Sequence, residues 1–347
     1  MNCEIVFVHL GEEIPEYLQR NCLQTQKNFP DTKVTLITNA KINSSTSYNT
    51  VNYRRTNRTE LVLSQIQLDI RFRDSFWVKT LERLLAVLEY QIDNQVSKLI
   101  HVESDVLIFP NLPLKAIQNL RKATWTRYSE TKCVGAFIYL PAPYIADLLL
   151  QESHKYILEY KDLTDMTLLN KLSENKNLVD TFSHHLLTGG DDGNSIQVDL
   201  NDEVYSGFFD PAQIGMWLTG EDPRNHLGIT TLHLNELFTS GDSPINPTAL
   251  SYFLNENNEL FAVNSDGVVF PIWTLHIHSK NVKLFSSNNQ LELARLVCKA
   301  KDHRIIRYWS PILFSKLVIE NIKRGTFLAY TKQTVKYIKV LLTSTAS

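Results

Sequence analysis

The sequence has 347 residues, of which 43% are hydrophobic, enough to bury the core of one large domain plus a smaller appendage. Its formal net charge of −2 lacks the overall basic excess that is typical of nucleic-acid binding, so no nucleic-acid partner is expected. The four cysteines are scattered without paired spacing, which gives no support to a cysteine zinc site or a disulfide framework.

The N-terminus lacks the pattern of a signal peptide, and no apolar run approaches the roughly 20 residues that cross a bilayer. A cytoplasmic protein is therefore expected. Hydrophobic periodicity predicts alternating strands and helices over the first hundred residues. The expected elements are, in chain order, a strand (4–10), a helix (15–29), a strand (32–38), two helices (60–70 and 76–92) and a strand ending at Glu103. Residues 40–58 are polar and aperiodic and predict a loop. The alternation predicts an α/β fold with a doubly wound sheet.

Two carboxylates, Glu103 and Asp105, follow the last of these strands in the run "KLIHVESDVLIFPNL". Burying unpaired carboxylates is unfavourable, so a basic side chain, backbone amides or a metal ion should neutralise them. Ligands of doubly wound sheets bind at the carboxyl ends of strands, and residues i and i+2 of an extended chain share a face. The pair therefore predicts a site for a hard divalent cation, Mn²⁺ or Mg²⁺. The structural alternative is a turn that the acids merely stabilise.

The run from "FWVKTLERLLAVLEY" to "KLIHVESDVLIFPNL" resembles the core of nucleotide-sugar glycosyltransferases of the GT-A fold. The nearest members are of the glycogenin and lipopolysaccharide-galactosyltransferase type, including proteins of bacterial envelope polysaccharide synthesis. The similarity extends over roughly residues 1–285 and rests on short motifs. It implies a Rossmann-like domain over residues 1–290 with a single doubly wound mixed sheet. Glu103 departs from the family's usual Asp, which changes the reach of the acid more than its chemistry.

The resemblance also implies donor-binding residues on the helix before the acid pair. A basic residue about twenty positions upstream serves the donor in that family, and Arg83 lies twenty residues before Glu103. Lys79 lies one helical turn earlier on the same face. His9, near the end of the first predicted strand, completes the expected donor-binding group on this side.

Two later segments fit the same family pattern. The strand "CVGAFIYL" (133–140) would pass beside the sugars, with its glycine allowing close approach, although a buried strand with a glycine bulge explains it equally well. In "KDLTDMTLLNKL" (161–172), Asp165 would point toward the donor sugar. The alternative is that Thr164 or Asp165 only caps a helix.

Residues 204–228 are dense in Gly, Pro, Asp and aromatic residues, a mixture that predicts a shaped loop over a pocket and no regular element. Similar runs occur in bacterial glycosyltransferase-like proteins of envelope polysaccharide pathways. Asp210 and Asp222 would hold sugar hydroxyls, and Arg224 a phosphate or an acceptor anion. A loop locked by its own Asp and Arg hydrogen bonds is the alternative. For an inverting reaction, Asp165 or Asp210 is the candidate general base.

The alternating run "TLHIHSK" predicts that His276, His278 and Lys280 share one face of a short strand. Histidine is a common ligand of transition metals such as Mn²⁺. The resemblance implies that one histidine completes the metal shell and that Lys280 meets the diphosphate. His278 is favoured for the metal, with His276 as the alternative, because the apolar neighbours do not choose between them.

The C-terminal segment, residues 291–347, is predicted to be a basic amphipathic helical extension. From Lys299 onward it has ten Lys or Arg residues and two acids. Such a surface favours anionic lipid headgroups, so a peripheral position on the inner face of the membrane is expected. A helical hairpin packed on the core with a solvated basic face is the alternative.

These patterns predict a metal-dependent, hexosyltransferase-like glycosyltransferase. It would move a sugar from a nucleotide-sugar to a saccharide or lipid-linked acceptor in surface polysaccharide or glycolipid synthesis. A UDP-sugar is the expected donor, because such donors are common among enzymes of the family that the sequence resembles. A sugar nucleotidyltransferase is one alternative, but the first strand is not followed by a Gly-rich basic loop. A non-catalytic carbohydrate-binding domain is the other. The donor sugar, the linkage, the stereochemical outcome and the oligomeric state are left open by the sequence.

Overall fold

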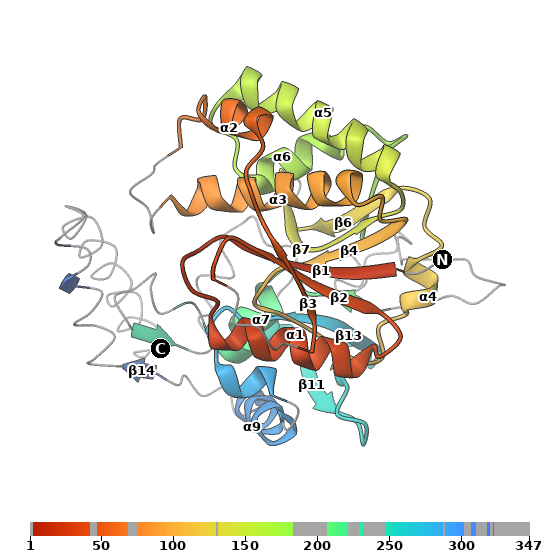
Figure 1. The fold of residues 1–347 in the computed structure, drawn as a ribbon. Coiled ribbons are helices and arrows are strands. Elements are labelled where there is room, and N and C mark those ends of the chain that lie inside the picture. The colour runs from red at the N-terminus through yellow and green to blue at the C-terminus, as the bar shows by residue number, and fades with distance from the viewer. Residues whose placement is uncertain are drawn as a thin grey trace.

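The protein is described from a computed structural model. The described residues are 3–41, 47–68, 75–129, 131–182, 207–220, 222, 229–231, 247–286, 289–301, 307–309, 318–319 and 322. Within them there are two large β-sheets and a two-stranded sheet, and the chain passes from the first large sheet to the second at the acid pair. The predicted strands and helices of the first hundred residues are mostly present (Figure 1).

The first sheet has seven strands in the order β3-β2-β1-β4-β7-β6-β8. Their bounds are β1 (Cys3–His9), β2 (Lys33–Thr38), β3 (Asn49–Asn52), β4 (Lys98–Val102), β6 (Ala123–Arg127), β7 (Cys133–Leu140) and β8 (Val179–Phe182). The order 3-2-1-4 is parallel and doubly wound, whereas β7 runs antiparallel to both of its neighbours. This mixed sheet confirms the α/β fold expected from the resemblance to GT-A glycosyltransferases.

Helices cover both faces of this sheet (Figure 1). On one face lie α2 (Asn57–Leu63), α3 (Phe76–Asp93), α5 (Pro143–Tyr160) and α6 (Asp165–Leu172), and on the other lies α1 (Glu16–Asn28). The apolar stripe of α3 explains its position, because Leu81, Leu84, Leu85 and Leu88 are all buried in the core beneath it. A single helical turn, α4 (Leu114–Ile117), links β5 to β6.

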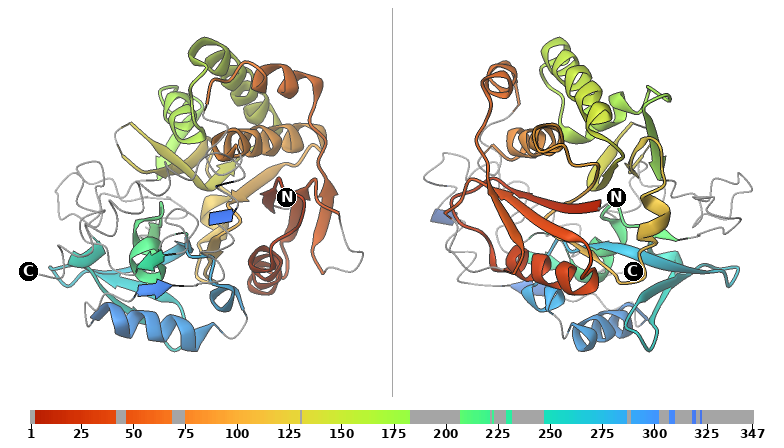
Figure 2. Two further views of the ribbon diagram at one scale, coloured as in Figure 1. Left: turned by 90° about the vertical axis from the view of Figure 1, so that its left-hand side faces the viewer. Right: turned by 45° about the vertical axis from the view of Figure 1, so that its right-hand side comes forward.

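The second sheet is an addition to the single sheet that the sequence predicted. Its strands are ordered β11-β12-β13-β5, and a short strand β9 pairs with β13. The bounds are β5 (Val106–Ile108), β9 (Phe208–Phe209), β11 (Ser251–Leu254), β12 (Leu260–Val263) and β13 (Val269–His276), accompanied by α7 (Gln213–Thr219), α9 (Gln290–Lys301), and the 3₁₀ turns η3 (Pro247–Ala249) and η4 (Val282–Phe285). Figure 2 shows this part of the chain at the opposite end of the molecule from α5.

Several predicted boundaries were wrong. Residues 40–58 were predicted to be loop, but they contain β3, which pairs with β2 through its backbone. The predicted helix 60–70 is the earlier and shorter α2. The segment 204–228 contains β9 and the helix α7 within the predicted loop. The strand predicted to carry both histidines ends at His276.

The predicted C-terminal extension begins with α9, whose residues Leu293, Leu296 and Val297 are buried in the core of the second sheet. Further along, β14 (Arg307–Trp309) pairs with β10 (Ile229–Thr231) as a two-stranded sheet. Most of the remaining extension lies outside the described residues, so its membrane role stays a prediction. In the part of the chain that the structure describes, no helix combines the length and the apolar character needed to span a bilayer.

Candidate metal and nucleotide site

The acid pair lies in the short turn that carries the chain from the first sheet to the second. Strand β4 ends at Val102 and β5 begins at Val106, and the N–H of Val106 donates to the carbonyl of Glu103 at 3.0 Å. The N–H of Glu103 in turn donates to the carbonyl of Ala136 on β7 at 3.2 Å. Asn21 of α1 supports the turn from outside, because its amide donates to the carbonyls of Ser104 and Val106. The turn is therefore anchored to both sheets and to a helix.

Strand β13 brings His276 against this turn. His276 is opposite Val106 in the β13–β5 ladder, and the N–H of Ile277 donates to the carbonyl of Asp105 at 2.7 Å. The imidazole Nε2 lies 3.4 Å from Oδ1 of Asp105 and 3.6 Å from Oε2 of Glu103. Ligand atoms of Glu103, Asp105 and His276 all lie within 4.8 Å of one another, and all three residues are buried.

This donor set fits a divalent cation. Two carboxylates and one imidazole suit Mn²⁺, and the carboxylates also suit Mg²⁺. The Nδ1 atom of His276 is buried and has no hydrogen-bond partner in the described parts of the chain, so the ring makes its polar contacts there through Nε2. Burial lowers the pKa of His276, but the charges of Asp105 and Glu103 outweigh it and raise that pKa. A proton on His276 and a metal ion are thus alternative ways to neutralise the same two acids.

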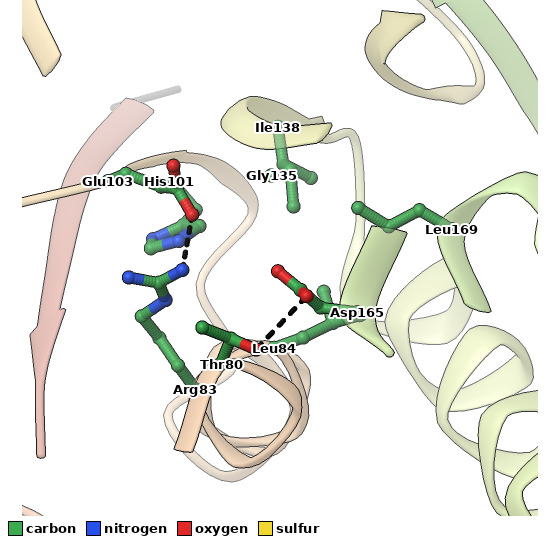
Figure 3. A pocket seen from close by; sticks show the side chains of 9 residues that line it. All are labelled: Thr80, Arg83, Leu84, His101, Glu103, Gly135, Ile138, Asp165 and Leu169. Carbon is green, nitrogen blue, oxygen red and sulfur yellow. Dashed lines mark hydrogen bonds and ion pairs between the residues drawn. The ribbon is translucent and has the colours of Figure 1, made fainter. Parts of the chain in front are cut away.

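Two cationic side chains flank the acids, one from each sheet. Arg83 of α3 forms an ion pair with Glu103 (Figure 3). On the other side, Nζ of Lys280 lies 2.9 Å from Oδ2 of Asp105 and 3.1 Å from Oδ2 of Asp222. Burial would raise the pKa of Asp105, yet the ammonium of Lys280 and the imidazole of His276 hold it well below its usual range.

Asp165 lies on the other side of Glu103, in a small pocket between α3, β4, β7 and α6 (Figure 3). Its carboxylate accepts a hydrogen bond from the hydroxyl of Thr80 at 3.0 Å. Burial raises the pKa of Asp165 to about 6; the charge of Arg83 opposes this shift, and that of Glu103 adds to it. The helix-capping alternative belongs to Thr164, whose side chain accepts the N–H of Thr167 and leaves the Asp165 carboxylate to the pocket.

Gly135 forms part of the wall of this pocket. A Cβ built at Gly135 would lie 3.8 Å from Oε1 of Glu103 and 3.9 Å from Leu169, which is ordinary van der Waals contact. The protein alone therefore has room for a methyl group at this position. The space that the glycine leaves opens onto Glu103 and Asp165.

Asp210, a candidate catalytic base from the sequence, occupies a different kind of position. It is fully buried at the end of β9, and its carboxylate accepts four backbone N–H groups, from Ala212, Ile214, Gly215 and His276. Burial raises the pKa of Asp210, and the N–H of His276 acts against that rise. Both oxygens are occupied by main-chain donors, an arrangement that corresponds to the locked-loop alternative and does not suit a proton acceptor for substrate.

The remaining predicted residues lie around the centre. The ring of His278 is 4.3 Å from that of His276, in the turn that follows β13; burial and the charge of His276 lower the pKa of His278 to about 3. The structure thus places His276, rather than the favoured His278, against the carboxylates. His9 lies at the end of β1, its Nε2 2.8 Å from the carbonyl of Glu13, and burial lowers its pKa, with Arg83 and Lys79 adding to this. Arg224 lies outside the described residues.

Two pocket residues escaped the sequence analysis. Thr80, which donates to Asp165, lies three residues before Arg83 and so faces the same side of α3, a spacing that could have identified it. His101, two residues before Glu103, lines the pocket, and its Nδ1 lies 3.1 Å from the carbonyl of Val6. Because a carbonyl only accepts, Nδ1 is the protonated ring atom. No periodicity distinguishes such a histidine from a core residue of the strand.

No family model matches this sequence, and no curated protein matches it either. Among solved structures, it is similar to the galactosyltransferase LgtC in complex with donor and acceptor sugar analogues, with 14% identity and a TM-score of 0.36. That similarity covers 51% of this chain and 72% of the LgtC chain. An active-site mutant of LgtC is similar at 16% identity with a TM-score of 0.35, covering 49% of this chain and 69% of the other.

Proposed function

We propose that this protein is a metal-dependent glycosyltransferase that moves a sugar from a nucleotide-sugar, a UDP-sugar in the first instance, to a saccharide or lipid-linked acceptor. The observation that carries the proposal is the convergence of Glu103, Asp105 and His276 on one buried point. Cations from opposite sides, Arg83 and Lys280, flank that point. Arg83 and Lys280 balance the two negative charges of the acid pair, and His276 adds to the same point the third ligand that a divalent cation would need.

The charge distribution suits the departure of a nucleoside diphosphate. Negative charge grows on this leaving group as the bond to the sugar breaks, and preorganised positive groups stabilise it. Lys280 would meet the diphosphate from the second sheet, and Arg83 would hold Glu103 in place from the first. His9, whose pKa burial and the nearby charges of Arg83 and Lys79 lower, would extend the donor site along the end of β1 together with Lys79. A cation held by Asp105, Glu103 and His276 would act as a Lewis acid toward the diphosphate.

The pocket around Asp165 has space for a group no larger than a water molecule or a hydroxyl, so it would meet one hydroxyl of the transferred sugar. Its wall combines a carboxyl group, the guanidinium of Arg83 and the hydroxyl of Thr80, which are groups that bind sugar hydroxyls. A pKa of about 6 lets Asp165 accept or donate a hydrogen bond near neutral pH. Asp165 is therefore the residue that we expect to contact the sugar. Gly135 would leave the space in which the sugar approaches Glu103.

The proposal is tested by incubating the protein with UDP- and GDP-sugars and Mn²⁺ and measuring release of the nucleoside diphosphate. Wild type should release it from one of these donors, faster when the acceptor glycan is present. Glu103→Gln and Asp105→Asn should lower the rate by at least a hundredfold. The matched control is Glu16→Gln, which changes an exposed acid of α1 paired with Arg20 and should leave the rate unchanged. Release of pyrophosphate from a nucleoside triphosphate and a sugar phosphate would instead identify a nucleotidyltransferase.

A further inference from the structure

Asp210, a buried residue next to the candidate metal site, accepts hydrogen bonds from main-chain N–H groups with both carboxylate oxygens. Oδ1 of Asp210 accepts the N–H groups of Ala212 and Ile214, both at 3.0 Å. Oδ2 accepts the N–H of Gly215 at 2.7 Å and that of His276 at 3.0 Å. The first three donors belong to the start of α7, so they form a helix cap. The fourth belongs to a different element, the last residue of β13.

The hydrogen bond from the N–H of His276 to Asp210 continues the pairing between β9 and β13 beyond the last paired residues of β9. Strand β9 pairs in parallel with β13 through Phe208 and Phe209, and the N–H of Asp210 donates to the carbonyl of Thr274. The chain then leaves β13 to form α7. The carboxylate of Asp210 takes over as the acceptor for His276 where the backbone of β9 has turned away. On its other edge, the N–H of the next residue, Ile277, donates to the carbonyl of Asp105, so the main chain of His276 is held on both sides.

Gly215 makes this close approach possible. A Cβ at Gly215 would lie 1.9 Å from the carbonyl oxygen of His276 and 2.7 Å from Oδ2 of Asp210. Any side chain at this position would push α7 away from the end of β13. The helix is thus seated directly against the main chain of the residue whose imidazole faces the two acids.

We propose that Asp210 is a positioning residue for the metal site, fixing the main chain of His276 so that its imidazole faces Glu103 and Asp105, with Gly215 providing the close contact. This inference rests on the proposed function, because it takes His276 to be a metal ligand. A helix cap alone would be complete with the donors of α7. The bond to His276 is what connects the cap to the site. Groups that orient metal ligands from behind typically change metal affinity ten- to hundredfold when they are altered.

The test is titration of Mn²⁺ into the protein without nucleotide or acceptor, followed by calorimetry and by the electron paramagnetic resonance of free Mn²⁺. Asp210→Asn keeps the shape of the side chain but places an amide NH₂ against backbone donors. We expect its dissociation constant to rise ten- to hundredfold. The control is Leu260→Ala, which truncates the core of the same sheet on β12 and should keep the wild-type constant within about twofold, although it destabilises the fold.

Two further variants make the result decisive. Gly215→Ala retains the carboxylate but displaces the carbonyl of His276, and it should weaken Mn²⁺ binding to a similar extent; it also serves if Asp210→Asn does not fold. In a His276→Ala background, Asp210→Asn should cause no further loss, because the two residues act through one ligand. Folded Asp210→Asn and Gly215→Ala proteins with wild-type affinity would overturn the inference alone. A wild type that binds Mn²⁺ through His276 but transfers no sugar would overturn the proposed function alone. A wild type that binds no Mn²⁺ would overturn both.

Discussion

The two sheets contribute to the site in different ways. The seven-stranded sheet and its helices deliver Arg83, Glu103 and Asp165 from regular elements, at the end of a strand or on a helix face. The second sheet delivers His276 and Lys280 from the end of β13 and the turn after it, where Lys280 has a positive φ of 53°. Apolar packing forms the core of both parts, but in the second part buried carboxylates that bind backbone N–H or ammonium groups also hold the site residues in place. Because its residues come from both sheets, the candidate site depends on the packing of the first and on the polar contacts of the second.

The largest expected effect comes from removing the cation of the first sheet. Arg83→Ala leaves the buried Glu103 without its ion-pair partner, so the free energy of unfolding should fall by about 3 kcal/mol. Chemical denaturation at neutral pH measures this change. The matched control is Arg20→Ala on α1, whose pair with Glu16 is 43% and 64% exposed and should contribute within about 0.5 kcal/mol. Equal effects of the two substitutions would show that Glu103 is solvated and would contradict a buried ion pair at the first sheet.

A glycine of β7 in the first sheet and one of α7, the helix packed on the second sheet, give a sharper comparison. Gly215→Ala should destabilise the protein by about 1–3 kcal/mol, because the new methyl group meets backbone at 1.9 Å. Gly135→Ala should leave stability within about 1 kcal/mol, since its methyl group finds only ordinary contacts. We nevertheless expect Gly135→Ala to slow sugar transfer at least tenfold, because it fills space beside Glu103. Thermal unfolding measures the effect on stability, and the diphosphate-release assay measures the effect on transfer. A Gly135→Ala protein with full activity would contradict the proposal that the sugar contacts this pocket.

A smaller effect concerns Asp165 and pH. Folding raises the pKa of this acid to about 6, so between about pH 4 and 6 the folded state binds more protons than the unfolded state. The contribution of Asp165 to stability therefore falls as pH rises through that window and stays unfavourable above it. Asp165→Asn should raise the free energy of unfolding at pH 8 by about 1–3 kcal/mol while abolishing transfer. At pH 4 the two proteins should be almost equally stable. A variant that is less stable than wild type at pH 8 would contradict the raised pKa.

The sequence predicted the first sheet better than the second for a physical reason. Strands such as β1 and β7 are short, continuous apolar runs, and the amphipathic helix α3 has a period of about 3.6 residues, so hydrophobicity alone reveals them. Strand β3 was missed because Asn49–Asn52 is short, polar and exposed at the edge, and it forms through backbone pairing with β2. Long-range pairing of this kind leaves no local signal.

The sequence predicted most residues of the candidate site, but it did not predict the contacts that these residues make. The acid pair after a buried strand, with Arg83 implied by the family resemblance, predicted one half of the site. The alternating "HIHSK" run was misleading, because β13 ends at His276 and the chain then turns. Strand periodicity had placed His276 and His278 on one face, and only the turn separates their roles. Asp210 had been read as a possible base because nothing in a sequence shows that four backbone N–H groups will converge on one carboxylate.

The central claim is that Asp105 and a divalent cation together bind a nucleoside diphosphate, and calorimetric titration of UDP and GDP into the protein tests it most directly. Wild type should bind one of the two nucleotides tightly with Mn²⁺ and at least a hundredfold more weakly without it. Asp105→Asn should lose the metal-dependent part of this affinity while it remains folded. Binding of neither nucleotide under any condition, or binding that is unchanged by Mn²⁺ and by Asp105→Asn, would contradict the account and leave Glu103 and Asp105 as a structural turn.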